Sequence, residues 1–141
     1  MKAYGSMQRH PRELAASWLA QATRDLDAAR YLFAGVRYDA SCFSAQQAAE
    51  KALKAALVLL VGDRPRTHQI SVLIAELSAH RPEAVEALGD LAALDPYYVT
   101  TRYPDAIGGA VPGMSFFEPE ARLALDRAAR AVTYVDGILG D

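Results

Sequence analysis

Apolar residues recur at helical spacing over most of the chain, and the longest regular run covers residues 41–61. This run contains no Gly or Pro, and its apolar side chains fall three and four positions apart. Past Lys54 it is apolar all round, which is typical of a helix end covered by other elements. The apolar face consists of Cys42, Ala45, Ala49, Ala52, Ala56 and Leu59. We therefore predict a central helix that is buried on most sides.

The same spacing predicts two further long helices, one before and one after this run. The first begins at Pro11, where the missing N–H costs nothing, and stops at Gly35. The last begins at Pro119, with Glu118 and Glu120 favourable at its positive end. The apolar positions are Leu14, Trp18, Ala22, Leu26, Ala29 and Phe33 in the first, and Ala121, Leu125, Ala128, Val132, Val135 and Leu139 in the last. The latter set forms a seam suited to packing along another long helix.

Shorter elements are predicted between the central and last helices. Thr67 can cap a short third helix, and a fourth helical stretch after Pro82 can be kinked or ended by Asp95-Pro96. The apolar face of the third helix is Ile70, Leu73, Ile74 and Leu77. That of the fourth is Val85, Leu88, either Leu91 or Ala92, and Tyr98. Residues 100–117 hold three Gly and two Pro without helical period, so they are predicted to form a long loop, a type usually functional or mobile.

These elements predict an all-α fold. The connection at residues 35–39 is short, with Asp39 or Ser41 available as N-cap, and it implies an antiparallel hairpin. We expect an up-and-down bundle of four or five helices with a long loop before the last. Residues 1–10 are expected to be a flexible leader and residues 11–141 a single domain.

Composition narrows the class of protein. The net charge of −2 gives the whole chain no attraction to nucleic acid or an anionic membrane, so such binding would need a local basic patch. The single cysteine, Cys42, excludes an intrachain disulfide and is expected to be a small buried residue. The first residues lack the apolar stretch of a secretory signal, and no run is long enough to span a bilayer. A cytoplasmic location is the expectation.

A polar stripe on the central helix is the first candidate site. Gln47, Glu50, Lys51 and Lys54 fall at i, i+3, i+4 and i+7 and share one face. The stripe can be a solvated face with a Glu50–Lys54 pair. It can also line a pocket in which the two lysines attract phosphate oxygens.

Two other groups of residues carry candidate chemistry. Arg64, Arg66 and His68 form either a charged loop or a small basic pocket. Arg102, Tyr103 and Asp105, preceded by Tyr97 and Tyr98, can bind phosphate and stack on a base. Equally, Arg102 and Asp105 can pin the loop by pairing, with the two tyrosines as core anchors. No catalytic sequence motif is present, and the isolated histidines do not favour a metal site.

Taken together, the pattern resembles the HEPN family (higher eukaryotes and prokaryotes nucleotide-binding domain). The segments that carry the resemblance are Trp18, Ala22, Asp25-Leu26 and Ala29; Tyr38, Phe43 and the run from Ala45 to Lys54; Thr67-His68 with Ile70 and Leu73; and Thr101 to Asp105. They cover residues 12–137 in the order found in that family.

The resemblance implies a five-helix bundle that commonly forms a homodimer and works with a minimal nucleotidyltransferase, encoded beside it as a toxin–antitoxin pair or fused to it. Many members are metal-independent ribonucleases that use an Arg followed a few residues later by a His. Arg102 fits the Arg position, but none of residues 106–109 is His. Ribonuclease chemistry through that pair is therefore not expected, because no evident general acid or base remains.

The leading hypothesis is a nucleotide- or RNA-binding HEPN protein with no cofactor. The residues expected to bind nucleotide or phosphate are Gln47, Lys51, Lys54, His68 and Arg102, with Tyr103 stacking and Asp105 holding Arg102. One alternative is a toxin ribonuclease whose acid or base comes from elsewhere, such as His68 or a Tyr. Another is a structural helical module that binds a protein partner.

Overall fold

The computed structural model describes residues 10–141, and residues 1–9 of the expected leader lie outside this range. Three long helices are α2 (Pro11–Ala34), α3 (Tyr38–Val61) and α7 (Glu118–Gly140). The short elements are α4 (Ile70–Ser78), α5 (Ala84–Leu88), η1 (Gly89–Leu94), α6 (Tyr97–Thr100), η2 (Pro104–Ile107) and η3 (Pro112–Met114). The described residues contain no strand, and the predicted all-α bundle is confirmed.

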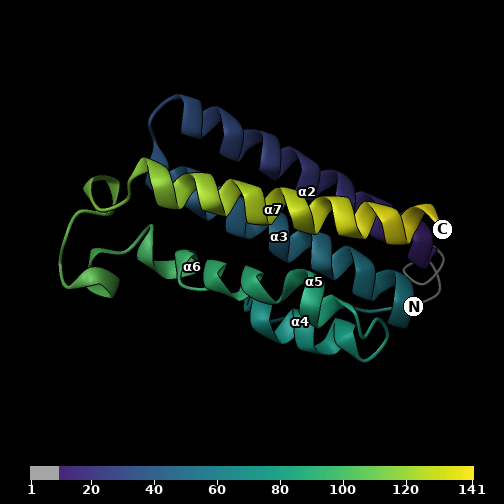
Figure 1. Cartoon of the computed structure of the whole chain (residues 1–141). Helices are drawn as coiled ribbons and strands as arrows, with labels where there is room; N and C mark the ends of the chain where they lie inside the picture. The colour runs from purple at the N-terminus through teal and green to yellow at the C-terminus, as the bar shows by residue number, and fades with distance from the viewer. Residues whose placement is uncertain (1–9) are drawn as a thin grey trace, which may run out of the picture.

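The three long helices lie side by side and make the body of the bundle (Figure 1). Helix α3 contacts both α2 and α7, while α4 and α6 pack against the remaining side of α3. The segment from η2 to η3 extends beyond one end of the bundle before the chain returns through α7 (Figure 1). Helix α3 is therefore central, as the sequence predicts, and it carries more buried residues than any other described element.

Small side chains fill much of the interface between the long helices. The buried positions of α7 are Ala121, Ala124, Ala128, Ala131, Val135 and Ile138. The predicted seam contains three of these, while its other members, Leu125, Val132 and Leu139, are only half-buried. Helix α7 packs on both α3 and α2, so its buried stripe faces the two helices together. Most of the buried residues are alanines, whose small side chains let the helices approach one another closely.

The start of α3 differs from the prediction. The helix begins at Tyr38, and its N-cap, Arg37, makes no capping side-chain hydrogen bond. Val36 adopts a left-handed φ of 62°, so the chain turns within fewer residues than expected. The predicted caps are therefore wrong: Asp39 lies inside the first turn, and Ser41 Oγ donates to the carbonyl of Ala29 at 2.8 Å.

A distant carboxylate caps α4. Gln69 holds the N-cap position, and the backbone amides of Ile70 and Ser71 donate to Asp95 Oδ1 and Oδ2 at 2.5 and 3.2 Å. Thr67 Oγ1 instead accepts from the Gln69 amide at 3.0 Å, too early in the chain to cap the helix. The predicted role of Thr67 is therefore wrong, because a long-range contact supplies the cap.

The predicted fourth helix is broken into α5, η1 and α6. Leu88 and Leu91 are buried as expected, and Tyr98 is half-buried. Val85, assigned to the apolar face, is 57% exposed, and that assignment is wrong. The change to 3₁₀ geometry at Gly89 rotates the following residues relative to α5, so one helical period does not describe the whole segment.

Candidate functional site

Two members of the polar stripe of α3, Glu50 and Lys54, belong to a buried network. Glu50 is 4% exposed and Lys54 5%. Glu50 Oε2 accepts a hydrogen bond from Lys54 Nζ at 3.0 Å, and Oε1 accepts one from Gln46 Nε2 at 3.1 Å. The solvated-face interpretation is therefore wrong, because a buried carboxylate here is satisfied by an ammonium and an amide.

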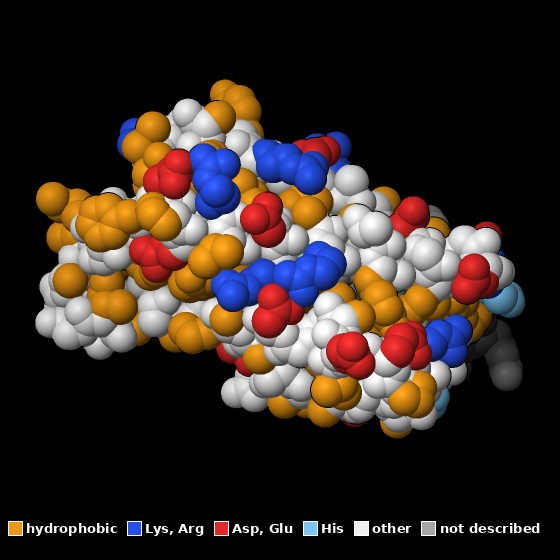
Figure 2. All heavy atoms as spheres, in the orientation of Figure 1, with side chains coloured by type: hydrophobic (Ala, Val, Ile, Leu, Met, Phe, Trp, Pro, Cys, Tyr) orange, Lys and Arg blue, Asp and Glu red, His pale blue; other side chains and the backbone are white. Residues whose placement is uncertain are grey.

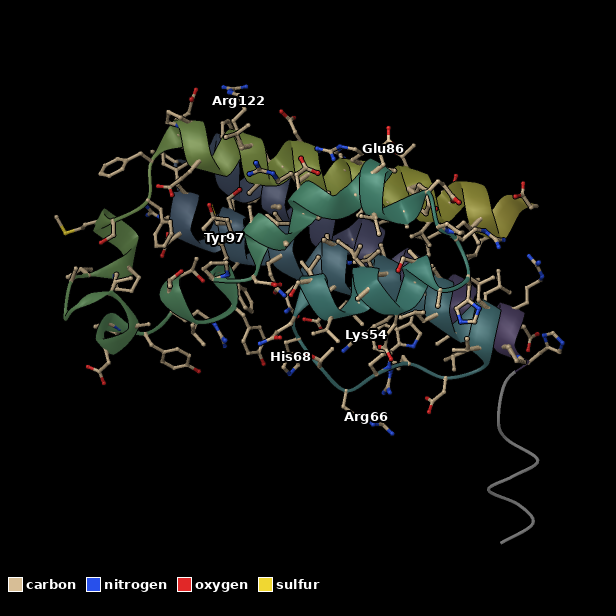
Figure 3. The ribbon with its side chains drawn as sticks, turned by 60° about the horizontal axis from the view of Figure 1, so that its bottom comes forward. Lys54, Arg66, His68, Glu86, Tyr97 and Arg122 are labelled. Atoms are coloured by element: carbon tan, nitrogen blue, oxygen red, sulfur yellow. The ribbon has the colours of Figure 1, made fainter. Side chains whose placement is uncertain are left out.

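His68 joins this network from the segment between α3 and α4. Its Nδ1 lies 3.3 and 3.2 Å from Glu50 Oε1 and Oε2, and Gln46 Nε2 donates to its carbonyl at 3.1 Å. A carboxylate only accepts, so this contact places a proton on Nδ1. The side chain is nevertheless 49% exposed, so solvent reaches the imidazole that Glu50 contacts. Figure 3 shows His68 on the same side of the molecule as Lys54.

Arg102 lies against three aromatic rings. Its guanidinium carbon is 4.5 Å from the ring centre of Phe43, 4.7 Å from that of Tyr98 and 4.9 Å from that of Tyr103. Nε donates to the carbonyl of Tyr98 at 2.8 Å, and Nη2 donates to the same oxygen. These contacts fix the guanidinium in place through backbone and ring faces while leaving it exposed.

Tyr98 brings Arg102 and His68 together. The imidazole stacks on its ring with centroids 4.2 Å apart and an interplanar angle of 14°. Since the guanidinium also lies over this ring, a fixed cation and a carboxylate-held imidazole share one aromatic platform. We call these four residues, Glu50, His68, Tyr98 and Arg102, the platform site.

Asp105 does not hold Arg102 as expected. Both side chains are exposed, and no ion pair joins them within residues 10–141. Arg102 has no carboxylate partner anywhere in that range. Two of the five N–H donors of a guanidinium contact the Tyr98 carbonyl, so three remain for a ligand.

The other expected phosphate ligands are engaged inside the protein. Lys51 Nζ lies 2.7 Å from Asp25 Oδ2 on α2, a buried oxygen whose partner is this ammonium. Gln47 Nε2 donates to Gln46 Oε1 at 2.8 Å, and Lys54 is paired as described. The structure therefore brings together His68, Arg102 and Tyr103 but places Gln47, Lys51 and Lys54 in contacts within the bundle.

The predicted pocket of Arg64, Arg66 and His68 does not converge. The guanidinium of Arg64 lies 4.9 Å from the ring centre of Trp18 on α2, whereas His68 turns toward Glu50. Trp18, expected in the core, is half-buried, and Lys54 Nζ lies 6.0 Å from its ring. The aromatic side chain thus covers the buried lysine and supports an arginine at the surface.

The sequence pattern does not reveal two contributors to the site. Gln46 lies outside the predicted polar stripe, although it is four residues before Glu50 and so one turn away on the helix. That spacing is the signal that could have identified it. Phe43, which supports Arg102, is among the residues that carry the family resemblance, but its spacing does not place it beside Arg102, because the bundle brings the two residues together.

The remaining polar chemistry of the described part is limited. Burial raises the pKa of the Cys42 thiol to about 12, with smaller contributions from Glu120 and Asp39. The thiol is therefore not a thiolate nucleophile at neutral pH.

Between residues 10 and 141, no group of three His, Cys, Asp or Glu side chains converges as a metal site. No described helix has the length and apolar character needed to cross a membrane.

Comparisons with known proteins identify the family. The family model for the HEPN domain matches residues 15–138. The crystal structure of TT1696 from Thermus thermophilus is similar at 38% identity and a TM-score of 0.77, over 87% of this chain and 96% of that one. The structure of ST0689, described as an archaeal HEPN homologue, is similar at 34% identity and a TM-score of 0.73, over 94% and 99% of the two chains. No curated protein matches the chain. With most of its length matched, the chain belongs to the HEPN family.

Proposed function

We propose that this HEPN protein binds a nucleotide or RNA at the platform site and works as a homodimer with a minimal nucleotidyltransferase. The observation that carries the binding proposal is Arg102, a guanidinium without a carboxylate partner among the described residues, fixed on three rings beside His68. Its free N–H donors suit phosphate oxygens, and the exposed Tyr103 ring suits a base. The homodimer, the nucleotidyltransferase partner and the toxin–antitoxin setting rest on the family resemblance.

Titration calorimetry with ATP tests the binding site. We expect wild-type protein to bind ATP and Arg102→Ala to lose about 1.5–3 kcal/mol of binding free energy, the range for a hydrogen bond to a charged group. Arg122→Ala is a matched control, because the Arg122 guanidinium lies 5.0 Å from the Phe33 ring centre, far from His68 in Figure 3. An unchanged affinity in Arg102→Ala, or no binding to wild type, would exclude this site.

The assembly is tested separately. Analytical ultracentrifugation of the protein alone is expected to give twice the monomer mass of 15.3 kDa. Co-expression with the nucleotidyltransferase from an adjacent reading frame, where one is encoded, is expected to give a complex that survives gel filtration. A monomer that also fails to retain this partner would leave only the binding proposal.

A second candidate function, a ribonuclease, is favoured by the Glu50–His68 contact. With Nδ1 bound to Glu50, Nε2 is the nitrogen that can accept a proton from a ribose 2′-OH. The 2′-oxygen would attack phosphorus as the P–O5′ bond breaks, water would protonate the leaving 5′-oxygen, and Arg102 would balance the charge on the phosphoryl oxygens.

The products distinguish this candidate from binding alone. Cleavage of single-stranded RNA would leave 2′,3′-cyclic phosphate and 5′-hydroxyl ends, and His68→Ala would abolish it. A substrate with a 2′-deoxy sugar at the cut position would remain intact. If wild-type protein binds RNA without cutting it, the ribonuclease candidate is rejected and the binding proposal stands.

A further inference from the structure

Trp18 is the single tryptophan of the chain, and its ring is not enclosed by the core. It borders a shallow groove of about 430 Å³ that runs along α2. The groove is lined by Leu14, Ser17, Trp18, Gln21 and Lys51. A half-buried indole beside an open groove offers a nucleobase the part of the ring that Arg64 and Lys54 do not cover.

Arg64 places a positive charge at this indole. Its guanidinium carbon lies 4.9 Å from the Trp18 ring centre, and it forms no ion pair with a carboxylate in the described part of the chain. Asp63 accepts a hydrogen bond from the backbone amide of Arg64, and Glu76 lines a neighbouring groove with it. Arg64 thus resembles Arg102 in lying over an aromatic ring without a carboxylate ion pair, although it lies over one ring and Arg102 over three.

A continuous chain of contacts connects the two arginines. From Arg102 it passes through Tyr98 and His68 to Glu50, then through Lys54 to Trp18 and Arg64. Phe43 and Lys54, the residues of α3 beneath the two ends, are 11 positions apart in the sequence. At 1.5 Å per residue this separates their backbones by roughly 16 Å along the helix. A nucleoside monophosphate does not cover that distance, whereas a short strand does.

The arginines along this path have no ion pair among the described residues and are the groups that a polyanion would contact. Glu50 is the carboxylate inside the path, and Lys54 neutralises its charge, while Asp63 and Glu76 lie near Arg64 without forming an ion pair with it. Arg66 is exposed, has no ion pair among the described residues, and lies on the same side of the molecule as His68 and Lys54 (Figure 3). The face drawn in Figure 2 mixes both signs of charge, and the net charge of the chain is −2, so phosphate binding depends on arginines that no carboxylate pairs.

We propose that Trp18 and Arg64 form a second subsite, which takes the base and phosphate of a neighbouring nucleotide, so that the ligand is a single-stranded oligonucleotide. This inference rests on the proposed function, since the platform site holds the other end of the strand. Arg66 contacts the phosphates between the two ends. The arrangement of stacking rings and cations is the one by which proteins bind single strands.

Intrinsic fluorescence reports on this subsite directly, because Trp18 is the only tryptophan. The protein is titrated with AMP and with an adenine-only RNA of about six nucleotides, within the site sizes of single-strand binders. We expect the hexanucleotide to quench Trp18, whereas AMP at concentrations that saturate the platform site by calorimetry leaves it unchanged. Equal quenching by AMP would overturn the proposal, since the indole would then take a mononucleotide by itself.

Variants separate the two subsites, with binding of labelled hexanucleotide followed by anisotropy. Arg64→Ala is expected to weaken hexanucleotide binding about tenfold. It should also lower the dependence of the binding constant on salt concentration by the equivalent of about one phosphate contact. Trp18→Leu is expected to weaken binding roughly 5- to 100-fold, the range for a lost base-stacking contact, while Trp18→Phe retains most affinity. Neither Arg64→Ala nor Trp18→Leu should change AMP binding, and Arg122→Ala should change nothing.

The outcomes distinguish this inference from the proposed function. If Arg102→Ala loses both ligands while Arg64→Ala and Trp18→Leu bind the hexanucleotide as wild type does, the second subsite is rejected and the platform site stands. If wild-type protein binds neither ligand, both proposals fail. The DNA hexanucleotide of the same sequence shows which sugar the strand carries: tighter RNA binding identifies RNA, and tighter DNA binding identifies single-stranded DNA.

Discussion

Glu50 is a carboxylate in the interior of a helical bundle, and its hydrogen bonds reach two different parts of the molecule. Lys54 and Gln46 lie on its own helix, while His68 comes from the following segment. Burying such a group is costly unless its charge is paired and its lone pairs are occupied. Glu50 therefore both orients His68 and joins the segment before α4 to α3.

Glu50→Leu tests this role. We expect it to lower the free energy of unfolding by about 3–5 kcal/mol, because Lys54 is left as a buried charge without its partner. Urea denaturation followed by circular dichroism measures the change. The double variant Glu50→Leu/Lys54→Met should recover most of the loss, since the unpaired ammonium is then gone.

Lys51→Met is the matched control for this prediction. Lys51 is on the same helix and also pairs with a carboxylate, but its side chain is 24% exposed and that of Asp25 19%. Its loss should cost less, about 1–3 kcal/mol, because Asp25 Oδ2 is left buried without a partner while the rest of that side chain is partly exposed. Equal costs for Glu50→Leu and Lys51→Met would contradict the distinction between the two pairs.

The sequence predicts the residue types of the site better than their roles. The chemistry of Arg102, His68 and Tyr103 suits a nucleotide, and the structure places them together. The spacing of Lys51 and Lys54 shows that they share a face but not what covers it. Asp25 and Glu50 neutralise their charges through contacts that depend on how α2 packs on α3 and on which side chains the bundle buries.

At the scale of elements, the long helices and the short ones differ in how far sequence defines them. The bounds of α2 and α7 follow from Pro11, Gly35 and Pro119, together with a sustained helical period. Helix α4 has only nine residues, too few to be stable by itself, and its cap comes from Asp95. Contacts between distant segments therefore determine how the short elements begin.

Asp95→Ala should destabilise the protein by about 1–2 kcal/mol, because the Ile70 and Ser71 amides lose their acceptor at the start of α4. Hydrogen exchange at Ile70 and Ser71 should accelerate in the same variant. Thr67→Ala, which removes the acceptor of the Gln69 amide alone, should cost less. A larger loss in Thr67→Ala would mean that the local residue, and not Asp95, stabilises the helix start.

At the scale of the whole molecule, three buried or half-buried acids among residues 10–141 resist ionisation. Burial is the main cause in each, and it raises the pKa values of Cys42, Tyr97 and Tyr134 to about 12. In the unfolded chain these groups ionise near 9.0 for the thiol and 10.0 for the phenols. Between those values and pH 12, the unfolded state binds fewer protons than the folded state, so stability falls as pH rises.

We therefore expect the free energy of unfolding to decline from about pH 9 toward pH 12, with little contribution from these groups below about pH 9. Denaturant titrations at a series of pH values measure this. Cys42→Ala should remove the earliest part of the decline, because the thiol has the lowest unfolded pKa of the three. A wild-type stability that rises over this interval would show that other groups dominate.

The same burial predicts a chemical property. The thiol of Cys42 is fully buried and stays protonated at about pH 8, so native protein should react with a thiol reagent such as dithionitrobenzoate only as fast as it opens. Denatured protein should react at once. Rapid reaction of the native state would indicate that the packing of α3 against its neighbours is looser than the structure has it.

The sequence by itself determined the helical class, the three long helices, the central place of α3 and the family to which the chain belongs. Those features follow from periodicity and from residues close to one another in the chain. Only the tertiary structure decided which polar side chains remain available for a ligand. Lys51 and Lys54 are neutralised by carboxylates, whereas Arg102 rests on aromatic rings and has no ion pair among the described residues. The reason is physical: the partner of each charge comes from the three-dimensional packing, and side chains of the same charge therefore differ in what they can bind.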